Sequence, residues 1–211
     1  MVSSSDRFVG GAMQTEQWLE QLANGDTNAL DQILQSHRGY LRRLLEVHMD
    51  AEMRGRIDPS DLIQETHIVV SRRIDEFLET RPASFRVWLR GKAMDRLIDA
   101  RRKHIGADKR SVRREVALSE ASSMALANSV LSQQPGDAAQ REELIQLTHQ
   151  AIQQLSEADR AVLVLRHVED LSNLEAAEVL EISPDAASKR YGRAILRLRT
   201  VLVQAGALSK N

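Results

Sequence analysis

The 211-residue chain contains no cysteine, which excludes disulfide bridges, zinc–thiolate sites and a cysteine nucleophile. Aromatic residues make up only 3% of the sequence, and the period-two alternation that is typical of strands is scarce. No run of 18 apolar residues occurs, and residues 1–18 contain no apolar core of a signal peptide. These absences predict an all-α protein of the cytoplasm that does not contact a membrane.

Charged residues are plentiful, at 28%, and they nearly cancel to a net charge of −1. Their distribution is uneven. Residues 86–114 hold eleven basic and three acidic side chains, a local net charge of +8, whereas "DPSDLIQE" and "RIDEFLE" are acidic. A basic segment beside an acidic one suggests two different partners, and nucleic acid fits the basic one.

Start signals divide the first hundred residues into helices. Asp26 can cap one helix, Asp58 with Pro59 begins another, and Ser84 a third. Residues 105–139, rich in Ser, Ala and Gln, predict a flexible linker with at most a marginal helix. The predicted helices cover about 15–24, 26–49, 58–77 and 84–102. The predicted architecture is two small helical domains, at 12–104 and 140–206, joined by a linker at 105–139.

The C-terminal part predicts a helix-turn-helix. Ser156 and Ser172 each precede an acidic residue by three positions, and Ser183-Pro184 begins the last helix. The predicted helices cover about 140–154, 157–168, 173–180 and 183–204, with only residues 181–183 between the last two. The last helix should expose Asp185, Ser188, Lys189, Gly192 and Arg193 on one face. Such a face can enter the major groove of DNA, although an ordinary amphipathic helix with a solvated basic face has the same pattern.

Two aromatic positions flank the loop "LETRPAS" at residues 78–84. Trp88 lies at core spacing within its predicted helix, so we expect it to be buried. Phe77 lies at a helix end beside a proline-containing loop, and we expect it to be the residue that contacts bases.

The ordered motifs resemble the sigma-70 family of bacterial RNA polymerase sigma factors, of the small extracytoplasmic-function type. "DPSDLIQET" is similar to the family's D-x-x-D-L-V-Q-E segment, and "FRVWLRGKAMDRLIDARR" to its F-x-x-W-L … D-x-x-R-R segment. "LSEADRAVLVLRHVEDLSNLEAAEVLEISPDAASKRYGRAILRLR" is similar to the family's helix-turn-helix region. Together the motifs cover both ends of the chain in the family's order.

The resemblance implies binding to core RNA polymerase and promoter DNA, with no cofactor or metal and no enzymatic activity. An anti-sigma factor is a further candidate partner, and the free chain would be a monomer. The residues implied to dock on the polymerase are Asp61, Leu62, Gln64 and Glu65. Those implied to recognise and melt the −10 element are Phe77, Arg86, Arg90, Asp95 and Arg96, with Phe77 in the loop that captures a flipped base. Those implied to read the −35 element are Ser188, Lys189, Arg190, Gly192 and Arg193.

The chain departs from the family pattern at several positions. Asp95 stands where the family has an asparagine near the flipped base, and an ionised carboxylate cannot donate a hydrogen bond. Glu181 stands where the turn usually has glycine, so we expect a less left-handed turn. Gly192 replaces a larger side chain and gives up one contact.

Two other functions fit part of this sequence pattern. A helix-turn-helix regulator that is not a polymerase subunit would not need the acidic "DLIQE" surface. An enzyme could use Asp58, Asp61, Glu65 and His67 as metal ligands, but Asp58 is explained as a helix cap, and no catalytic motif accompanies these residues. Copurification with core polymerase distinguishes a sigma factor from a regulator.

Overall fold

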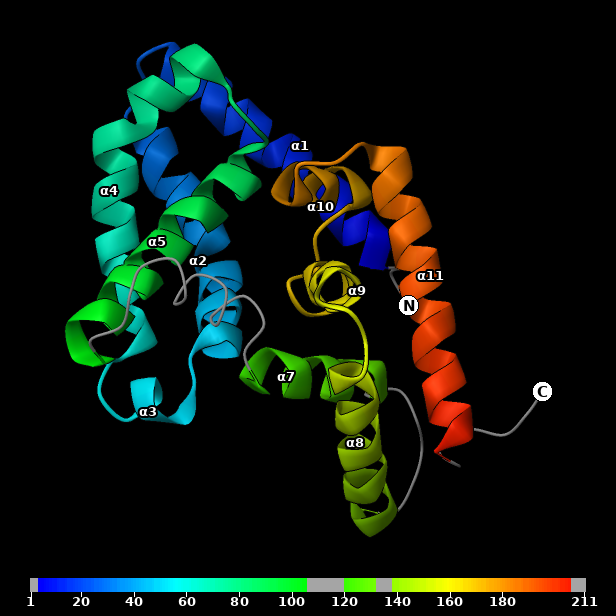
Figure 1. The fold of residues 1–211 in the computed structure, drawn as a ribbon. Helices are drawn as coiled ribbons and strands as arrows, with labels where there is room; N and C mark the ends of the chain where they lie inside the picture. Colours follow the sequence, from blue (N-terminus) through cyan, green and yellow to red (C-terminus); the bar gives the residue numbers. More distant parts are fainter. Residues whose placement is uncertain (1–3, 106–119, 132–137, 206–211) are drawn as a thin grey trace.

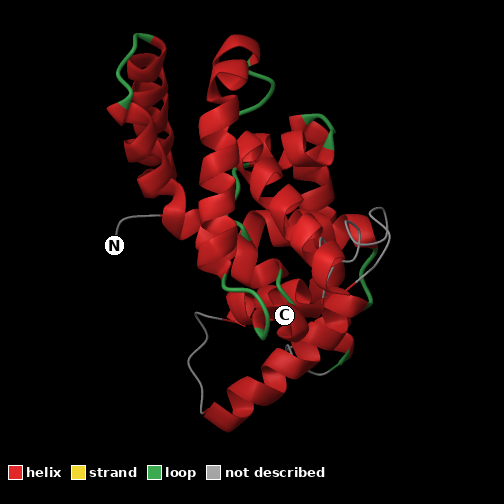
Figure 2. Ribbon diagram, turned by 90° about the vertical axis from the view of Figure 1, so that its left-hand side faces the viewer, coloured by secondary structure: helices red, strands yellow, loops and turns green. Residues whose placement is uncertain are grey.

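The computed structural model describes residues 4–105, 120–131 and 138–205, and within these ranges every regular element is a helix (Figures 1 and 2). The elements in chain order are α1 (Ser4–Ala23), α2 (Asn28–His48), α3 (Ala51–Arg54), α4 (Pro59–Thr80), α5 (Phe85–Ile105), α7 (Glu120–Leu131), α8 (Ala138–Gln153), α9 (Glu157–Leu163), η1 (Val164–Val168), α10 (Asn173–Leu180) and α11 (Pro184–Gln204). The predicted all-α class is confirmed.

Helices α1 to α5 form the N-terminal half, in which α2, α4 and α5 pack against one another and α1 packs on α2 (Figure 1). The side chains of Leu41, Ile63 and Leu89 are almost fully buried between them. Helix α4 begins as predicted, because the Asp58 carboxylate accepts a hydrogen bond from the backbone N–H of Ser60 at 2.7 Å. It runs three residues beyond the predicted end at Phe77.

Helices α8 to α11 form the C-terminal half, and serine caps set the starts of α9, α10 and α11. The Ser156 side chain accepts from the N–H of Asp159, and the Ser183 side chain accepts from the N–H of Ala186. Between α9 and α10 lies η1, a π-helical turn that holds one residue more than an α-helical turn. The buried residues of this half include Ile152, Val162 and Leu198.

Helix α7 differs from the expected flexible linker. It packs against α8 and η1 and also contacts α2. Leu126 and Ala127 are fully buried, and the Ser129 hydroxyl donates to the backbone carbonyl of His167 at 3.0 Å. Small, uncharged side chains gave the segment a linker-like composition, but they also let α7 lie close to its neighbours. The rest of the predicted linker, residues 106–119 and 132–137, lies outside the described residues.

The two halves touch where α10 lies beside α5. Leu165, Leu171 and Ala176 of the C-terminal half are buried in the same apolar cluster as the core of α2, α4 and α5. This contact positions the polar residues described below.

Candidate nucleic-acid interface

The helix-turn-helix is built by α10, residues 181–183 and α11. Ser172 and Glu175 form a reciprocal capping box at the start of α10. The N–H of Ile182 donates to the carbonyl of Ala177 at 3.1 Å and closes the turn. Ala177 and Ala187 are buried where the two helices meet, so their small side chains allow the close approach.

Glu181 takes the left-handed conformation, with φ 54° and ψ 41°. The expectation of a less left-handed turn was therefore wrong. The hydrogen bonds that end α10 require this backbone geometry, and they outweigh a cost of about 1–2 kcal/mol for a residue with a Cβ atom.

The exposed face of α11 carries Ser188, Lys189, Gly192 and Arg193, as predicted from the spacing. Lys189 Nζ lies 2.8 Å from the Asp185 carboxylate, and both side chains are largely exposed. Arg193 forms no hydrogen bond or ion pair with any residue that the structure describes. Arg190 lies half-buried beside this face. Lys189 and Arg193 can therefore reach the edges or phosphates of a DNA groove.

The opposite side of α11 fixes the helix on its domain. Ala194 and Leu198 are buried, and the Tyr191 hydroxyl lies 3.0 Å from Nε2 of His167. The Arg166 guanidinium lies over the Tyr191 ring at 5.6 Å from its centroid. The basic face of α11 is thus held on a rigid support.

The candidate polymerase-docking residues lie on α4. Asp61, Gln64 and Glu65 are exposed on this helix, but Leu62 is only 2% exposed and packs in the core. Leu62 therefore supports the face from beneath rather than forming part of it. Sequence reasoning missed Ile68, which is 51% exposed and follows Asp61 and Glu65 at the i, i+4, i+7 spacing of one helical face.

The aromatic residues near the loop after α4 do not lie as expected. Phe77 is 1% exposed, and its ring packs edge-on against Phe85 with centroids 5.4 Å apart. The ring centroids of Trp88 and Phe77 lie 4.8 Å apart. Trp88 is half-buried, and Lys92 Nζ lies 5.3 Å from the centroid of its ring. Phe77 belongs to the core, because it continues the buried stripe of Val70 and Ile74, so it is not placed to contact bases as expected. Trp88 packs against the same core, as expected, but is only partly buried.

A basic hollow of about 300 Å³ lies between α4 and α5. Among its lining residues are Asp95 and Arg96, which were predicted, and Arg72, Arg73 and Lys92, which were not. The Arg96 guanidinium also pairs with Asp99 at 2.8 Å, and the Asp95 carboxylate is exposed. The signal that could have identified Arg72 and Arg73 is their place on the α4 face that packs beside α5.

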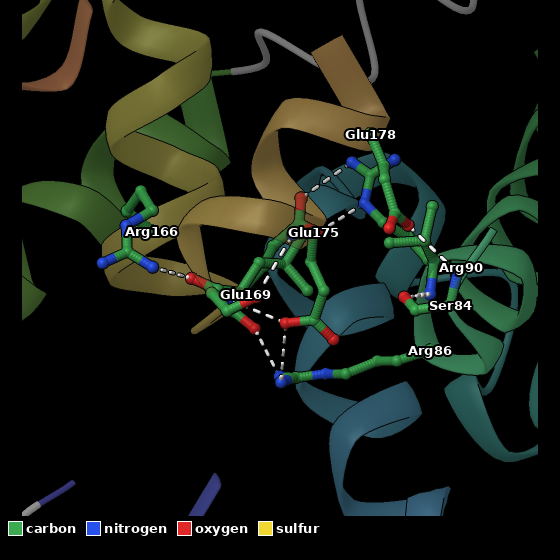
Figure 3. Close-up of polar contacts among 10 residues, drawn as sticks. Ser84, Arg86, Arg90, Arg166, Glu169, Glu175 and Glu178 are labelled. Carbon is green, nitrogen blue, oxygen red and sulfur yellow. Dashed lines mark hydrogen bonds and ion pairs between the residues drawn. The ribbon is translucent and has the colours of Figure 1, made fainter. Parts of the chain in front are cut away.

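The remaining two candidates, Arg86 and Arg90, are held by the C-terminal half (Figure 3). Arg90 binds both carboxylate oxygens of Glu169, with Nε–Oε2 at 2.5 Å and Nη2–Oε1 at 2.9 Å. Arg86 donates to the backbone carbonyl of Glu169 at 2.9 Å and lies 3.8 Å from the Glu175 carboxylate. Both arginines are about 15% exposed. In this conformation neither is available to DNA.

Glu169 itself is fully buried. Its Oε1 also lies 2.8 Å from Nε2 of His48. Burial alone would raise the pKa of Glu169, but the charge of Arg90 and the hydrogen bonds from Arg90 and His48 outweigh it and hold the pKa well below its usual range. Glu169 therefore stays ionised inside the protein.

Neither a membrane span nor a metal cluster is found in the part of the chain that the structure describes. None of the helices there combines the length and the apolar character needed to cross a bilayer. No three of the described His, Asp and Glu side chains gather closely enough to hold a metal ion.

Comparison with known proteins relates parts of the chain to sigma factors. The family described as Sigma-70, region 4 matches residues 145–198, which include α9, η1, α10 and most of α11. The RNA polymerase sigma factor CnrH of Cupriavidus metallidurans is 29% identical over 185 residues, covering 86% of this chain and 91% of CnrH. The structure of CnrH in complex with the cytosolic domain of CnrY has a similar fold, with a TM-score of 0.52 and 21% identity over 90% of this chain and 98% of that one. Residues 145–198 therefore match region 4 of the sigma-70 family, and most of the chain is similar to an RNA polymerase sigma factor.

Proposed function

We propose that this sigma factor binds core RNA polymerase in the cytoplasm and directs promoter-specific initiation. In this proposal residues 12–104 recognise and melt the −10 element, and residues 140–206 read the −35 element. Residues 105–139, which include α7, connect the two domains. The observation that carries the proposal is the capped helix-turn-helix, which presents Lys189 and Arg193 outward.

Reading of the −35 element is assigned to α11. A helix in the major groove reads guanine best through the bidentate donors of arginine. Arg193 is exposed and has no partner among the described residues, so it is the best placed for this contact, whereas Lys189 must first leave Asp185. Ser188, Gly192 and Arg190 border the same face, where Gly192 lets the backbone approach the DNA closely.

Recognition of the −10 element is assigned to the surface of α4 and α5. Arg96 and Asp95 border the basic hollow, and Trp88 is the partly exposed aromatic beside it. Aromatic stacking stabilises an unpaired base by about 1–3 kcal/mol, and basic side chains bind the strand independently of sequence. Asp95 can accept a hydrogen bond, which favours a base with an exocyclic amine. Arg86 and Arg90 extend this surface once Glu169 releases them.

Docking on the polymerase is assigned to the exposed face of α4. Asp61, Gln64 and Glu65 supply polar contacts, and Ile68 adds exposed apolar area beside them. Interfaces of this kind combine an apolar centre with a polar rim. An anti-sigma factor is a further proposed partner, and the similar protein CnrH has been solved in complex with the cytosolic domain of another protein, CnrY.

Reconstituted transcription tests the proposal. Core polymerase with the wild-type chain should yield run-off transcripts from a subset of genomic fragments, whereas core polymerase alone should not. The double variant Gln64→Ala/Glu65→Arg should lose copurification with polymerase while it keeps its melting temperature. A chain that binds duplex DNA but neither copurifies with polymerase nor supports transcription would instead be a helix-turn-helix regulator.

A further inference from the structure

His167 of η1 is held both by its backbone and by its ring. Its backbone carbonyl accepts a hydrogen bond of 3.0 Å from the hydroxyl of Ser129 in α7, 38 positions earlier in the chain. Nε2 of its ring lies 3.0 Å from the hydroxyl of Tyr191 in α11, 24 positions later. One residue therefore joins the helix of the predicted linker to the helix that carries the candidate −35 residues.

The carbonyl of His167 lies at a helix end, where a partner from another element is needed. The last carbonyls of a helix have no N–H partner within that helix, and η1 ends at Val168. The N–H of Glu169 closes the π-helical turn by donating to the carbonyl of Val164 at 3.0 Å, and Asp170 then takes the left-handed conformation, with φ 59°. Because the helix does not continue, the Ser129 hydroxyl serves as the cap for its C-terminal end.

Helix α7 is fixed in the C-terminal half well enough to provide this cap. Leu126 and Ala127 are fully buried and belong to the same apolar cluster as Ile152 and Val162. Within residues 122–130 of α7, only Asn128 is exposed. The helix lies across the end of α8 (Figure 1). It is therefore packed as part of this half and does more than connect the two halves.

Tyr191 lies inside the segment of α11 that is assigned to the −35 element. Ser188 precedes it by three positions and Arg193 follows it by two. The Arg166 guanidinium lies over its ring, 5.6 Å from the centroid. Burial and the charge of Arg166 lower the pKa of His167, so its ring is neutral at pH 7. A hydroxyl can donate or accept, so the contact between Tyr191 and His167 forms with either tautomer of the neutral ring.

Rotation of α11 about its axis determines what Arg193 can reach. An α-helix with its side chains has a radius of about 5–6 Å, so a rotation of about 20° moves a side chain by about 2 Å. Hydrogen bonds form over a donor–acceptor range of only about 0.5 Å. Contacts to base edges therefore depend on the group that fixes this rotation, whereas the general attraction of a basic face to phosphates depends on it much less.

We propose that α7 is a working part of the −35 reader, in which Ser129 and His167 are positioning residues that set the rotation of α11 through Tyr191. This inference rests on the proposed reading of the −35 element by α11. The contacts run without a break from the linker to the reading helix. The linker therefore controls promoter selectivity, and a chain whose α7 leaves η1 still binds duplex DNA but discriminates less between sequences.

Duplex binding by the full chain tests this inference. The probes are two short fluorescein-labelled duplexes, one with the −35 region of a promoter recovered by the run-off experiment and one with the same bases shuffled. Anisotropy at one salt concentration, well below the melting temperature of every variant, gives the ratio of the two affinities. Ser129→Ala, His167→Leu and Tyr191→Phe should each lower this ratio by about two- to tenfold, as expected for the loss of one hydrogen bond. Affinity for the shuffled duplex should change little.

Conservative and neighbouring variants distinguish positioning from a general loss of structure. Ser129→Thr keeps the hydroxyl, and His167→Gln keeps a polar group that can reach Tyr191, so both should retain most of the ratio. Asn128→Ala is the matched control in α7, because the Asn128 side chain donates to the Met124 carbonyl of its own helix at 3.0 Å. It should leave the ratio unchanged. Ser129→Ala/Tyr191→Phe should lose little more than either single variant, because both changes interrupt the same connection.

The outcomes separate failure of this inference from failure of the proposed function. A wild-type chain that shows no preference for the promoter duplex would contradict the −35 assignment and, with it, the positioning role. A wild-type chain that discriminates, together with Ser129→Ala and Tyr191→Phe variants that keep its full ratio, would overturn the positioning role alone. Equal losses on both duplexes would overturn it as well, because they would indicate lost phosphate contacts or lost folded protein and not a rotated helix.

Discussion

Arg90 and Glu169 lie 79 positions apart in the chain and form a bidentate ion pair, with N–O distances of 2.5 and 2.9 Å. A buried pair of this kind contributes little net stability compared with apolar residues, because both groups lose their hydration. Removing one partner is nevertheless costly, since the other is left as an unpaired buried charge. The pair is therefore better suited to selecting one arrangement of the two halves than to strengthening the fold.

A double-mutant cycle measures this coupling. We expect Glu169→Gln to lower the free energy of unfolding by about 3 kcal/mol, and Arg90→Gln to have a similar effect. The double variant should be less destabilised than the sum of the two, with an interaction energy of about 1–3 kcal/mol. Urea denaturation followed by circular dichroism provides the values, and additive losses would show that the two residues are not coupled.

The pH dependence of the contact between the two halves follows from the lowered pKa of Glu169. Arg90 and His48 face the carboxylate, Arg86 donates to the backbone carbonyl of Glu169, and Tyr40 lies beside Arg86. Since the pKa is lower with the halves in contact than in the unfolded chain, the contribution of Glu169 is present above its ordinary value of 4.5 and declines as the pH falls below it.

The measurement is the stability difference between wild type and Glu169→Gln as a function of pH. It should be nearly constant from about pH 8 to 6 and should shrink below about pH 4.5 as the unfolded carboxyl takes up a proton. A difference that grows with acidification would have the wrong sign for a lowered pKa.

The left-handed Glu181 predicts a stabilising substitution. Glu181→Gly removes the Cβ strain of about 1–2 kcal/mol but increases the freedom of the unfolded chain, so we expect a net gain of about 0.5–1 kcal/mol. Glu143→Gly, within the right-handed helix α8, is the matched control and should cost about 1 kcal/mol. Thermal denaturation of both variants checks the prediction, and a loss of stability in both would place Glu181 outside the left-handed region.

Arg193 is expected to read a base rather than a phosphate. Arg193→Ala should weaken binding to the promoter duplex by about 1–3 kcal/mol and weaken binding to random duplex much less. Lys189→Ala serves as the comparison, because Lys189 already pairs with Asp185 and should contribute less specificity. Fluorescence anisotropy on both duplexes separates the two roles, and equal losses on both duplexes would make Arg193 a phosphate contact.

Truncation of Phe77 should mainly lower the stability of the protein, whereas truncation of Trp88 should mainly impair promoter melting. Phe77→Ala empties a buried site and should cost about 3–5 kcal/mol of stability. Trp88→Ala should cost less stability and should reduce open-complex formation on duplex promoters, with partial recovery on a pre-melted bubble. Permanganate footprinting reports the melting. Unchanged melting in Trp88→Ala would remove the partly exposed tryptophan from base capture.

Local signals in the sequence predicted the starts of α4, α9, α10 and α11, whereas α1 begins at Ser4, well before the predicted start near residue 15. Asp58, Ser156, Ser172 and Ser183 all cap the helices that they were expected to cap, because capping depends on neighbouring residues alone. The exposed face of α11 was predicted for a similar reason, since helical spacing determines which residues share a face.

Features that depend on distant contacts were not predicted. Arg90 has a side chain suited to contacting DNA, but its partner Glu169 lies 79 positions further along the chain. Helix α7 is weakly patterned by itself and gains its burial from α8 and η1. Sequence spacing cannot show which half of the protein will cover a given face.

The contact between Ser84 and Glu178 couples the first turn of α5 to the contact between the two halves. Helices need acceptors for the N–H groups at their start, and here one acceptor is supplied by the other half of the chain. Separation of the halves returns this N–H to water and weakens the first turn of α5. Fraying of α5 and domain separation are therefore expected to be one cooperative event, visible as the simultaneous loss of hydrogen-exchange protection at residues 84–88 and at α10.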